Sequence, residues 1–347
     1  MRKSSPRLSL LVIGILLAWI TSSCSATPVQ LPTEAPLAAL QDTATALVPP
    51  SPTHTPPAEH SATPPPSTPL PATPLTRPTH TPTPVPAATA TPEATACAAP
   101  GHVESGAFTS AMTGAAHRYS IYLPPCYAAD GRNYPVLYLL AGNIHDETKW
   151  DELGIDEAAN AAILEGGSPP LLIVMPDGGW IANNTSGGPG SYETVILDEL
   201  IPHVEGNYCA WAEPAGRAIG GLSRGGYWAL EMAFRFPHAF ASVGGHSAAL
   251  LDQFAGPTIN PQFTALNNDL GSLRVYLDIG DDDYLRTNTI NLHEDMAVAG
   301  VQHEWRLNEG QHVDDYWAQH VADYLAWYVV PWSTGRDSYP ACTSSGP

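Results

Sequence analysis

Lysine and arginine are scarce in this sequence. Together they contribute 14 residues against 34 aspartates and glutamates, which gives the 347-residue chain a formal net charge of −20. Nucleic acids and anionic membranes are bound mainly through basic side chains. The composition therefore argues against a nucleic-acid partner and favours neutral or cationic substrates, with solubility as the simpler explanation of the charge.

Cysteine is also sparse, and its spacing does not suggest a zinc site. The five cysteines form no Cys-x-x-Cys pair and no Cys/His cluster, and we expect neither a metal nor an organic cofactor. Four of them, Cys97, Cys126, Cys209 and Cys342, suggest disulfides in an exported protein. Three pairings are open. We favour Cys97 with Cys342 and Cys126 with Cys209, and the alternative is four buried thiols.

The longest apolar run near the N-terminus is too short to span a bilayer comfortably. It covers Leu8–Ile20 and follows a basic start, as in an export signal. Small residues then precede Cys24, which resembles the lipobox of bacterial lipoproteins, although Thr21 stands where Leu is more usual. We expect residues 1–24 to direct export and Cys24 to be lipidated, which would be the chain's only membrane contact. Cleavage near Ala26 and secretion is the alternative.

Residues 25–97 contain few bulky apolar side chains. They are dominated by proline, threonine and alanine, and such a segment buries too little surface to offset its ordering entropy. We expect an extended stalk there, followed by one catalytic domain over residues 98–335 and a C-terminal tail over 336–347.

Buried strand patterns and helical patterns alternate through the domain. The expected strands are 118–123, 135–141, 171–175, 218–222, 240–244, 273–279 and 303–307. The expected helices are 150–164, 193–207, 227–236, 289–299 and 313–328. This order predicts an α/β fold with a mostly parallel central sheet and helices on both faces. Active sites of such sheets lie at the carboxyl ends of the strands.

A Gly-x-Ser-x-Gly motif joins one strand to the next helix. It consists of Gly221, Ser223 and Gly225. In a strand–turn–helix setting this motif is the nucleophile elbow, a turn so sharp that side chains at both flanking positions would collide. We therefore expect Ser223 to be a nucleophile, and a glycine-rich turn that merely contains serine is the alternative.

A serine nucleophile needs a base and a carboxylate that orients it. Three aspartates follow the strand 273–279, and we choose Asp283 as the acid with Asp281 second. The base is expected to be His312, which follows the last strand and precedes the last helix. An oxyanion hole would combine the amide of Arg224 with that of Asn143 or Ile144, in the loop after strand 135–141.

These residues together resemble the putative-esterase family of α/β-hydrolases, which includes esterase D-like enzymes, feruloyl esterases and mycolyltransferases. The resemblance covers roughly Gly106 to Trp327, and its most specific stretches are RAIGGLSRGGYWALEMAFRFPHAF, DIGDDDYL and NEGQHVDDYW. It implies Ser223 as nucleophile, Asp283 as acid and His312 as base. The family usually has His-Gly after the second strand, whereas this chain has Ala141-Gly142 and so lacks a side chain that often supports the oxyanion loop.

The sequence thus predicts an extracytoplasmic serine carboxylesterase that acts on a small-molecule or saccharide ester. An acyltransferase with a sugar acceptor would use the same residues, and a non-catalytic surface module is a third hypothesis. Four aromatic residues lie near loops that could face the site, where they would either stack on a sugar or phenolic ring or pack in the core. They are Trp150, Trp180, Tyr192 and Trp228.

Overall fold

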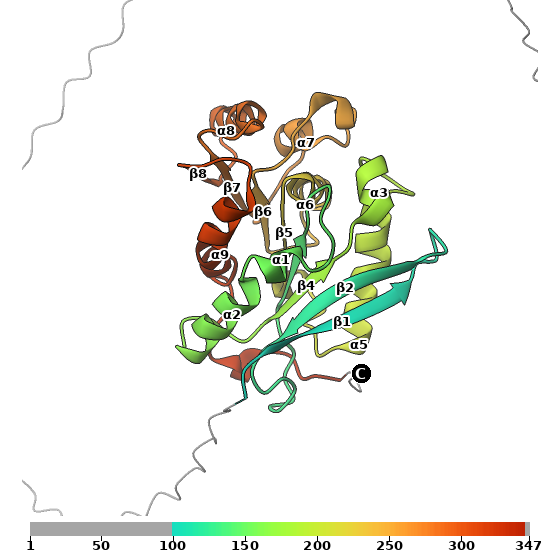
Figure 1. Ribbon diagram of the computed structural model, residues 1–347, viewed down its shortest axis with the longest axis vertical. Coiled ribbons are helices and arrows are strands. Elements are labelled where there is room, and N and C mark those ends of the chain that lie inside the picture. Colours follow the sequence, from blue (N-terminus) through green and yellow to red (C-terminus); the bar gives the residue numbers. More distant parts are fainter. Residues whose placement is uncertain (1–98, 344–347) are drawn as a thin grey trace, which may run out of the picture. The chain divides into compact units, whose positions relative to one another are not determined.

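A computed structural model describes residues 99–343, which fold around one eight-stranded sheet (Figure 1). The strands are β1 (His102–Thr109), β2 (Ala116–Leu123), β3 (Val136–Leu140), β4 (Leu172–Pro176), β5 (Arg217–Leu222), β6 (Ser242–His246), β7 (Arg274–Gly280) and β8 (Glu304–Asn308). Their spatial order is β1-β2-β4-β3-β5-β6-β7-β8. Strand β2 is antiparallel to both of its neighbours, β1 and β4, and β3 to β8 are parallel to one another.

Helices cover both faces of this sheet, which confirms the predicted fold class. They are α1 (Lys149–Glu152), α2 (Ile155–Leu164), α3 (Gly179–Asn184), α4 (Tyr192–Thr194), a π-helix (Val195–Leu200), α5 (Ile201–Asn207), α6 (Arg224–Arg235), α7 (Pro261–Asn267), α8 (Arg286–Ala299) and α9 (Asp314–Tyr328). Alternate residues of the buried strands point to opposite faces. Val136, Tyr138 and Leu140 pack in the cluster that includes α5, α6 and α8, whereas Leu137 and Leu139 pack in the cluster that includes α2 and α9.

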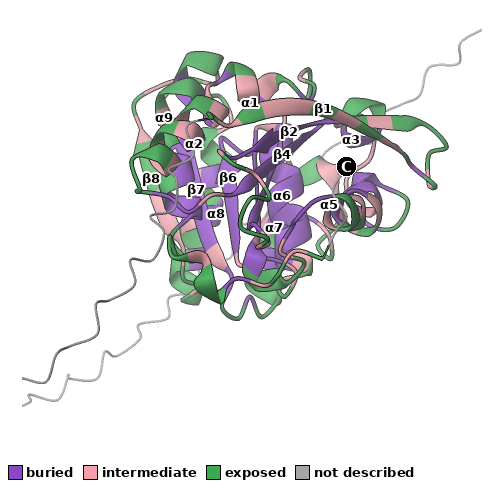
Figure 2. Ribbon diagram, turned by 90° about the horizontal axis from the view of Figure 1, so that it is seen from below, coloured by how far each residue is buried: buried purple, intermediate pink, exposed green. Residues whose placement is uncertain are grey.

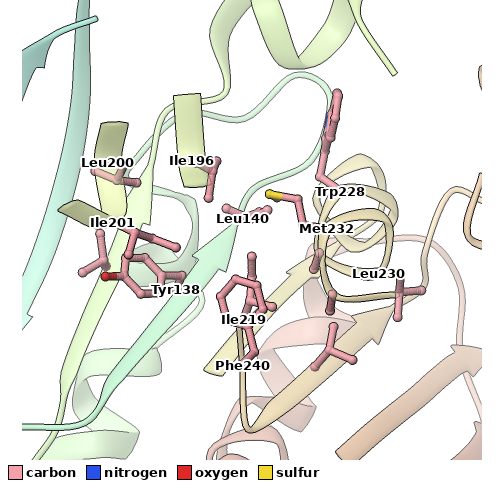
Figure 3. Packing of buried hydrophobic residues seen from close by; sticks show 14 of the residues in the cluster. Tyr138, Leu140, Ile196, Leu200, Ile201, Ile219, Trp228, Leu230, Met232 and Phe240 are labelled. Atoms are coloured by element: carbon pink, nitrogen blue, oxygen red, sulfur yellow. The ribbon is translucent and has the colours of Figure 1, made fainter. Parts of the chain in front are cut away.

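Helix α6 is the most deeply buried helix of the described residues, and the turn at Ser223 lies directly before it. Its residues from Arg224 to Phe234 are all buried. In Figure 3, Met232 points toward Leu140 of β3, and Leu230 and Trp228 lie along the same helix. Figure 2 shows the resulting layer of buried strands and α6 enclosed by exposed outer helices. The rigid core therefore extends directly to the first residue of α6.

Several boundaries differ from the sequence-based expectation. The helix expected over 150–164 is broken at Gly154, which has φ 89° and forms the N-cap of α2. The helix expected over 193–207 is continuous but contains a π-helical stretch. Strand β1 and the short helices α3 and α7 were not predicted, because β1 is half exposed and the two helices are seven residues or fewer.

The predicted disulfide pairing was wrong. Cys209 bonds Cys342, with their Cα atoms 5.1 Å apart, which rules out both favoured pairs. The C-terminal segment doubles back beside the start of β3, where the Cys342 amide donates to the Gly131 carbonyl, and the adjoining Tyr134 amide donates to the Cys209 carbonyl. Cys126 is also disulfide-bonded, while Cys97 and Cys24 lie outside the described residues.

The start of the expected tail packs against the domain rather than leaving it. Tyr339 is buried, and the Arg336 guanidinium pairs with Asp130 at 2.9 Å and lies over the ring of Tyr134. The folded unit thus extends beyond residue 335. Within residues 99–343, no helix is both long enough and apolar enough to cross a bilayer.

Candidate active site

Ser223 occupies the tight turn between β5 and α6. Its φ of 54° and ψ of −118° are strained for a residue with a side chain. A Cβ at Gly221 would lie 2.3 Å from the backbone carbon of Gly225, and a Cβ at Gly225 would lie 2.1 Å from the Leu140 carbonyl oxygen. Both flanking positions therefore require glycine, as the motif predicted, because the turn presses against itself and against β3.

The backbone of Ser223 is fixed on both sides. Its amide donates to the His246 carbonyl at 2.9 Å, and its carbonyl accepts from the amides of Tyr227 and Ala249. Strand β6 and the segment after it thereby hold the strained turn. The hydroxyl is left to project from the carboxyl end of the sheet.

The structure brings Ser223, His312 and Asp283 into one line of hydrogen bonds. His312 Nε2 lies 2.9 Å from Ser223 Oγ, and His312 Nδ1 lies 2.8 Å from Asp283 Oδ2. Asp283 is fully buried, and its second oxygen accepts from the Leu285 amide at 2.8 Å. The rings of Tyr284 and Trp317 flank the imidazole at 4.7 and 4.9 Å between centroids. A hydroxyl, an imidazole and a buried carboxylate thus stand in the order that proton abstraction from serine needs.

The neighbouring aspartates hold the loop that carries His312. Asp281 Oδ1 accepts from the Gly310 amide at 3.0 Å, and Asp282 Oδ2 accepts from Gln311 Nε2 at 2.7 Å. The carboxylate that accepts from the imidazole is that of Asp283, the first choice from sequence, whereas Asp281 accepts from the loop backbone.

The expected oxyanion donors lie around Ser223. Asn143 and Ile144 line the same pocket as Ser223, and Arg224 supplies the first amide of α6, where the helix dipole is positive. Asn183 Nδ2 of α3 donates to the Asn143 carbonyl at 2.7 Å. This contact holds the loop in which the sequence lacks the family's usual histidine.

The Arg224 side chain turns away from the pocket. Its Nε donates to the Ala182 carbonyl at 3.1 Å, its Nη2 donates to the Thr185 carbonyl, and the guanidinium lies 3.9 Å from the ring centre of Phe254. Burial lowers the pKa of Arg224 to about 10, so the group stays charged at neutral pH. Only the backbone of this residue is available to an oxyanion.

A pocket of about 580 Å³ opens above Ser223. Its lining combines apolar, aromatic and acidic residues: Asn143, Ile144, His145, Ser223, Tyr284, His312, Val313, Asp314, Asp315 and Trp317. The nearby Lys149 ammonium is already paired with Glu152 and Asp314, at 2.9 and 3.1 Å. Burial, together with the charge of Lys149, lowers the pKa of His145. The pocket wall therefore carries net negative charge at neutral pH.

The pocket wall differs more from the sequence-based expectation than the line of Ser223, His312 and Asp283 does. Of the four aromatic residues considered, Trp150, Tyr192 and Trp228 are buried packing residues, and Trp180 is 72% exposed on α3. Tyr284, Asp315 and Trp317 line the pocket and were not singled out, although Tyr284 directly follows the chosen acid. Within residues 99–343, no cluster of histidine, cysteine or carboxylate side chains is arranged to hold a metal ion.

Comparison with known proteins identifies the family. The family described as "Putative esterase" matches residues 110–328. The chain belongs to this esterase family. The resemblance drawn from the sequence motifs is thereby confirmed.

Among curated relatives, an esterase of Mycobacterium tuberculosis is 36% identical over 178 residues, which cover 49% of this chain and 38% of that protein. An endo-1,4-beta-xylanase/feruloyl esterase of Xylanibacter ruminicola is 31% identical over 222 residues, 60% of this chain and 29% of that protein. The chain thus spans well under half the length of these relatives.

Solved structures of esterases share the fold. A ferulic acid esterase superposes with a TM-score of 0.61 at 26% identity, covering 67% of this chain and 98% of the other. An S-formylglutathione hydrolase of Staphylococcus aureus superposes with a TM-score of 0.57 at 19% identity, covering 67% and 100%. At that identity, the second likeness shows the α/β-hydrolase fold alone.

Proposed function

We propose that this protein is a serine carboxylesterase in which Ser223 is the nucleophile, His312 the general base and Asp283 the orienting acid. The observation that carries the proposal is the hydrogen-bonded line from Ser223 Oγ through the imidazole to a fully buried carboxylate. Membership of the esterase family supports it.

The reaction starts when Ser223 Oγ attacks the ester carbonyl carbon and His312 Nε2 takes the hydroxyl proton. The tetrahedral intermediate collapses as the imidazolium returns that proton to the leaving alcohol. A water molecule, deprotonated by the same imidazole, then attacks the acyl-enzyme. The imidazolium returns this proton to Ser223 Oγ as the carboxylic acid leaves. Asp283 holds the Nδ1–H tautomer and stabilises the imidazolium throughout.

The oxyanion is stabilised by backbone amides. The amide of Arg224 at the start of α6 and the amide of Asn143 or Ile144 supply the donors. Removal of one such donor typically costs about 10²–10³-fold in kcat. The buried Arg224 side chain and the Asn183–Asn143 contact hold both donor segments in place.

The proposed substrates are uncharged esters of carbohydrates or phenolic acids. The acidic wall at Asp314 and Asp315 and the exposed ring of Tyr284 suit a neutral, ring-containing ester. The names of a feruloyl esterase relative and a ferulic acid esterase neighbour agree with this class. The proposal includes export, with a lipid anchor at Cys24, which the sequence motif supports.

A fluorophosphonate probe and a panel of esters test the reaction. We expect the wild type to be labelled on Ser223 and to hydrolyse p-nitrophenyl acetate and methyl ferulate. Ser223→Ala should keep the circular dichroism spectrum and melting temperature of the wild type and lose both labelling and turnover. A folded wild type that takes no label and hydrolyses none of the esters contradicts the proposal.

A further inference from the structure

A second His–Asp pair lies inside the protein beneath the nucleophile turn. His246, the last residue of β6, and Asp278 of β7 are both completely buried, and His246 Nδ1 lies 2.7 Å from Asp278 Oδ1. No step of the proposed reaction uses either residue. A charged or strongly polar pair in a core is costly unless every polar atom finds a partner, so the pair needs an explanation.

Three tyrosine hydroxyls of α9 complete the cluster. Tyr316 and Tyr324 both donate to Asp278 Oδ2, at 2.7 and 2.8 Å, and Tyr328 Oη lies 3.0 Å from His246 Nε2. Burial raises the pKa of Tyr316 and of Tyr324, so both hydroxyls keep their protons and act as donors. The ring of Tyr324 also stacks on the imidazole of His246, 3.7 Å between centroids.

The cluster touches the nucleophile turn through the backbone. The His246 carbonyl accepts the Ser223 amide, and the Asp278 carbonyl accepts the Ser247 amide, both at 2.9 Å. Tyr328 Oη lies against the strand that leads into the turn, because a Cβ at Gly220 would lie 1.8 Å from it. A shift of His246 would therefore move the backbone that holds Ser223.

The same cluster touches the histidine loop from the other side. Tyr316 stands four residues after His312, in the first turn of α9. Its ring lies against Gly310, where a Cβ would be 2.6 Å from Tyr316 Cδ2, and its hydroxyl accepts from Asn308 Nδ2 at 3.1 Å. The Tyr316 side chain thus connects Asp278 to the segment that precedes His312, and its backbone belongs to the helix that follows His312.

We propose that His246, Asp278 and Tyr316 are positioning residues that hold the Ser223 turn and the His312 loop in register. The two segments are 89 residues apart in sequence, and their hydroxyl–imidazole distance is set through this shared buried anchor. An error of about 1 Å between reacting groups can cost on the order of 10²-fold in rate. The inference rests on the proposed reaction at Ser223.

Tyr316→Phe and Tyr324→Phe form a matched pair for the test. Each removes one hydroxyl from the same carboxylate oxygen, and Tyr316→Phe also removes the bond from Asn308, so we expect a somewhat larger loss of melting temperature in Tyr316→Phe. Only Tyr316 adjoins the His312 loop. We expect Tyr316→Phe to lower kcat for p-nitrophenyl acetate about tenfold with KM within about twofold, and Tyr324→Phe to lower kcat by less than about twofold.

Asp278→Asn provides a second test. We expect it to lower kcat at least as much as Tyr316→Phe does and to leave KM at the wild-type value. If this variant does not fold, the tyrosine pair still decides. Equal losses of kcat in the two tyrosine variants, or wild-type kcat in Tyr316→Phe, would overturn the positioning role. A wild type without esterase activity would instead contradict the proposed reaction.

Discussion

At the scale of single residues, three consecutive aspartates after β7 have three different partners. Asp283 contacts the imidazole of His312, while Asp281 and Asp282 bind the backbone of Gly310 and the side chain of Gln311. The two loops are also in close backbone contact, since a Cβ at Gly280 would lie 2.3 Å from the Gly310 carbonyl oxygen. Identical side chains in this turn therefore have separable effects.

Asp283→Asn should be far more harmful to turnover than Asp281→Asn. The amide in place of the Asp283 carboxylate favours the wrong imidazole tautomer, and we expect kcat to fall by about 10³–10⁴-fold. Asp281→Asn weakens one hydrogen bond to a loop amide and should cost less than about tenfold in kcat. Steady-state kinetics on p-nitrophenyl acetate measure both, and the reverse order would move the orienting acid to Asp281.

At the scale of elements, the short helix α3 holds the loop after β3. Asn183 and Asn184 each donate to a carbonyl four residues earlier in their own helix, at 3.0 and 2.8 Å, but only Asn183 also reaches the Asn143 carbonyl. Variants of the two asparagines can therefore distinguish a loss of helix stability from a loss of support for the loop that carries Asn143.

Asn183→Ala should lower kcat by about tenfold, because a loosened donor amide stabilises the oxyanion less well. Asn184→Ala loses the same kind of helix-local bond and should stay within about twofold of wild-type kcat. Stopped-flow measurement of the acylation rate, with melting temperatures alongside, distinguishes the two. Equal losses in both variants would show that helix stability, rather than loop support, is what matters.

The sequence predicted those strands and helices whose residues follow a strong local pattern of apolar and polar side chains. Strands β3 to β7 are buried runs, and the motif glycines identified the turn at Ser223. Strand β1 has a half-exposed pattern that resembles a loop, and Gly154 breaks a helix whose apolar period continues past it. The pairing of Cys209 with Cys342 depends on where the C-terminal segment returns, and cysteine number alone leaves three pairings equal. The bond from Asn183 to the Asn143 carbonyl and the His246–Asp278 cluster also join residues far apart in the sequence, so no local pattern predicts them.

At the scale of the whole molecule, acidic residues outnumber basic ones and give a net charge of −20, and the same excess is found in the pocket wall. Asp314 and Asp315 line it, and the ammonium of Lys149 is already paired. Like charges at close range repel even in a partly hydrated site. The excess of acidic residues should therefore affect which esters enter, and not only solubility.

Anionic esters should be poorer substrates than neutral esters of equal size. We expect kcat/KM for p-nitrophenyl hemisuccinate to be about tenfold below that for p-nitrophenyl butyrate at low salt, with the gap narrowing as salt is added. Asp315→Asn should raise the anionic value about threefold and leave the neutral one unchanged. The exposed Asp295→Asn on α8, which does not line the pocket, serves as the charge-matched control. If the kcat/KM values of the anionic and neutral esters are about equal at every salt concentration, this prediction is wrong.

Both ends of the described domain lie where the parallel strands begin, at the end of the sheet opposite Ser223. His102 pairs with Leu123, which adjoins the start of β4, and Cys342 is bonded to Cys209, whose carbonyl accepts from Tyr134 just before β3. Strand β5 has six residues, so about 20 Å of sheet separates this end from the nucleophile. A surface coupled at either end of this domain would thus leave the pocket mouth facing the liquid, where bulky or insoluble esters can reach it.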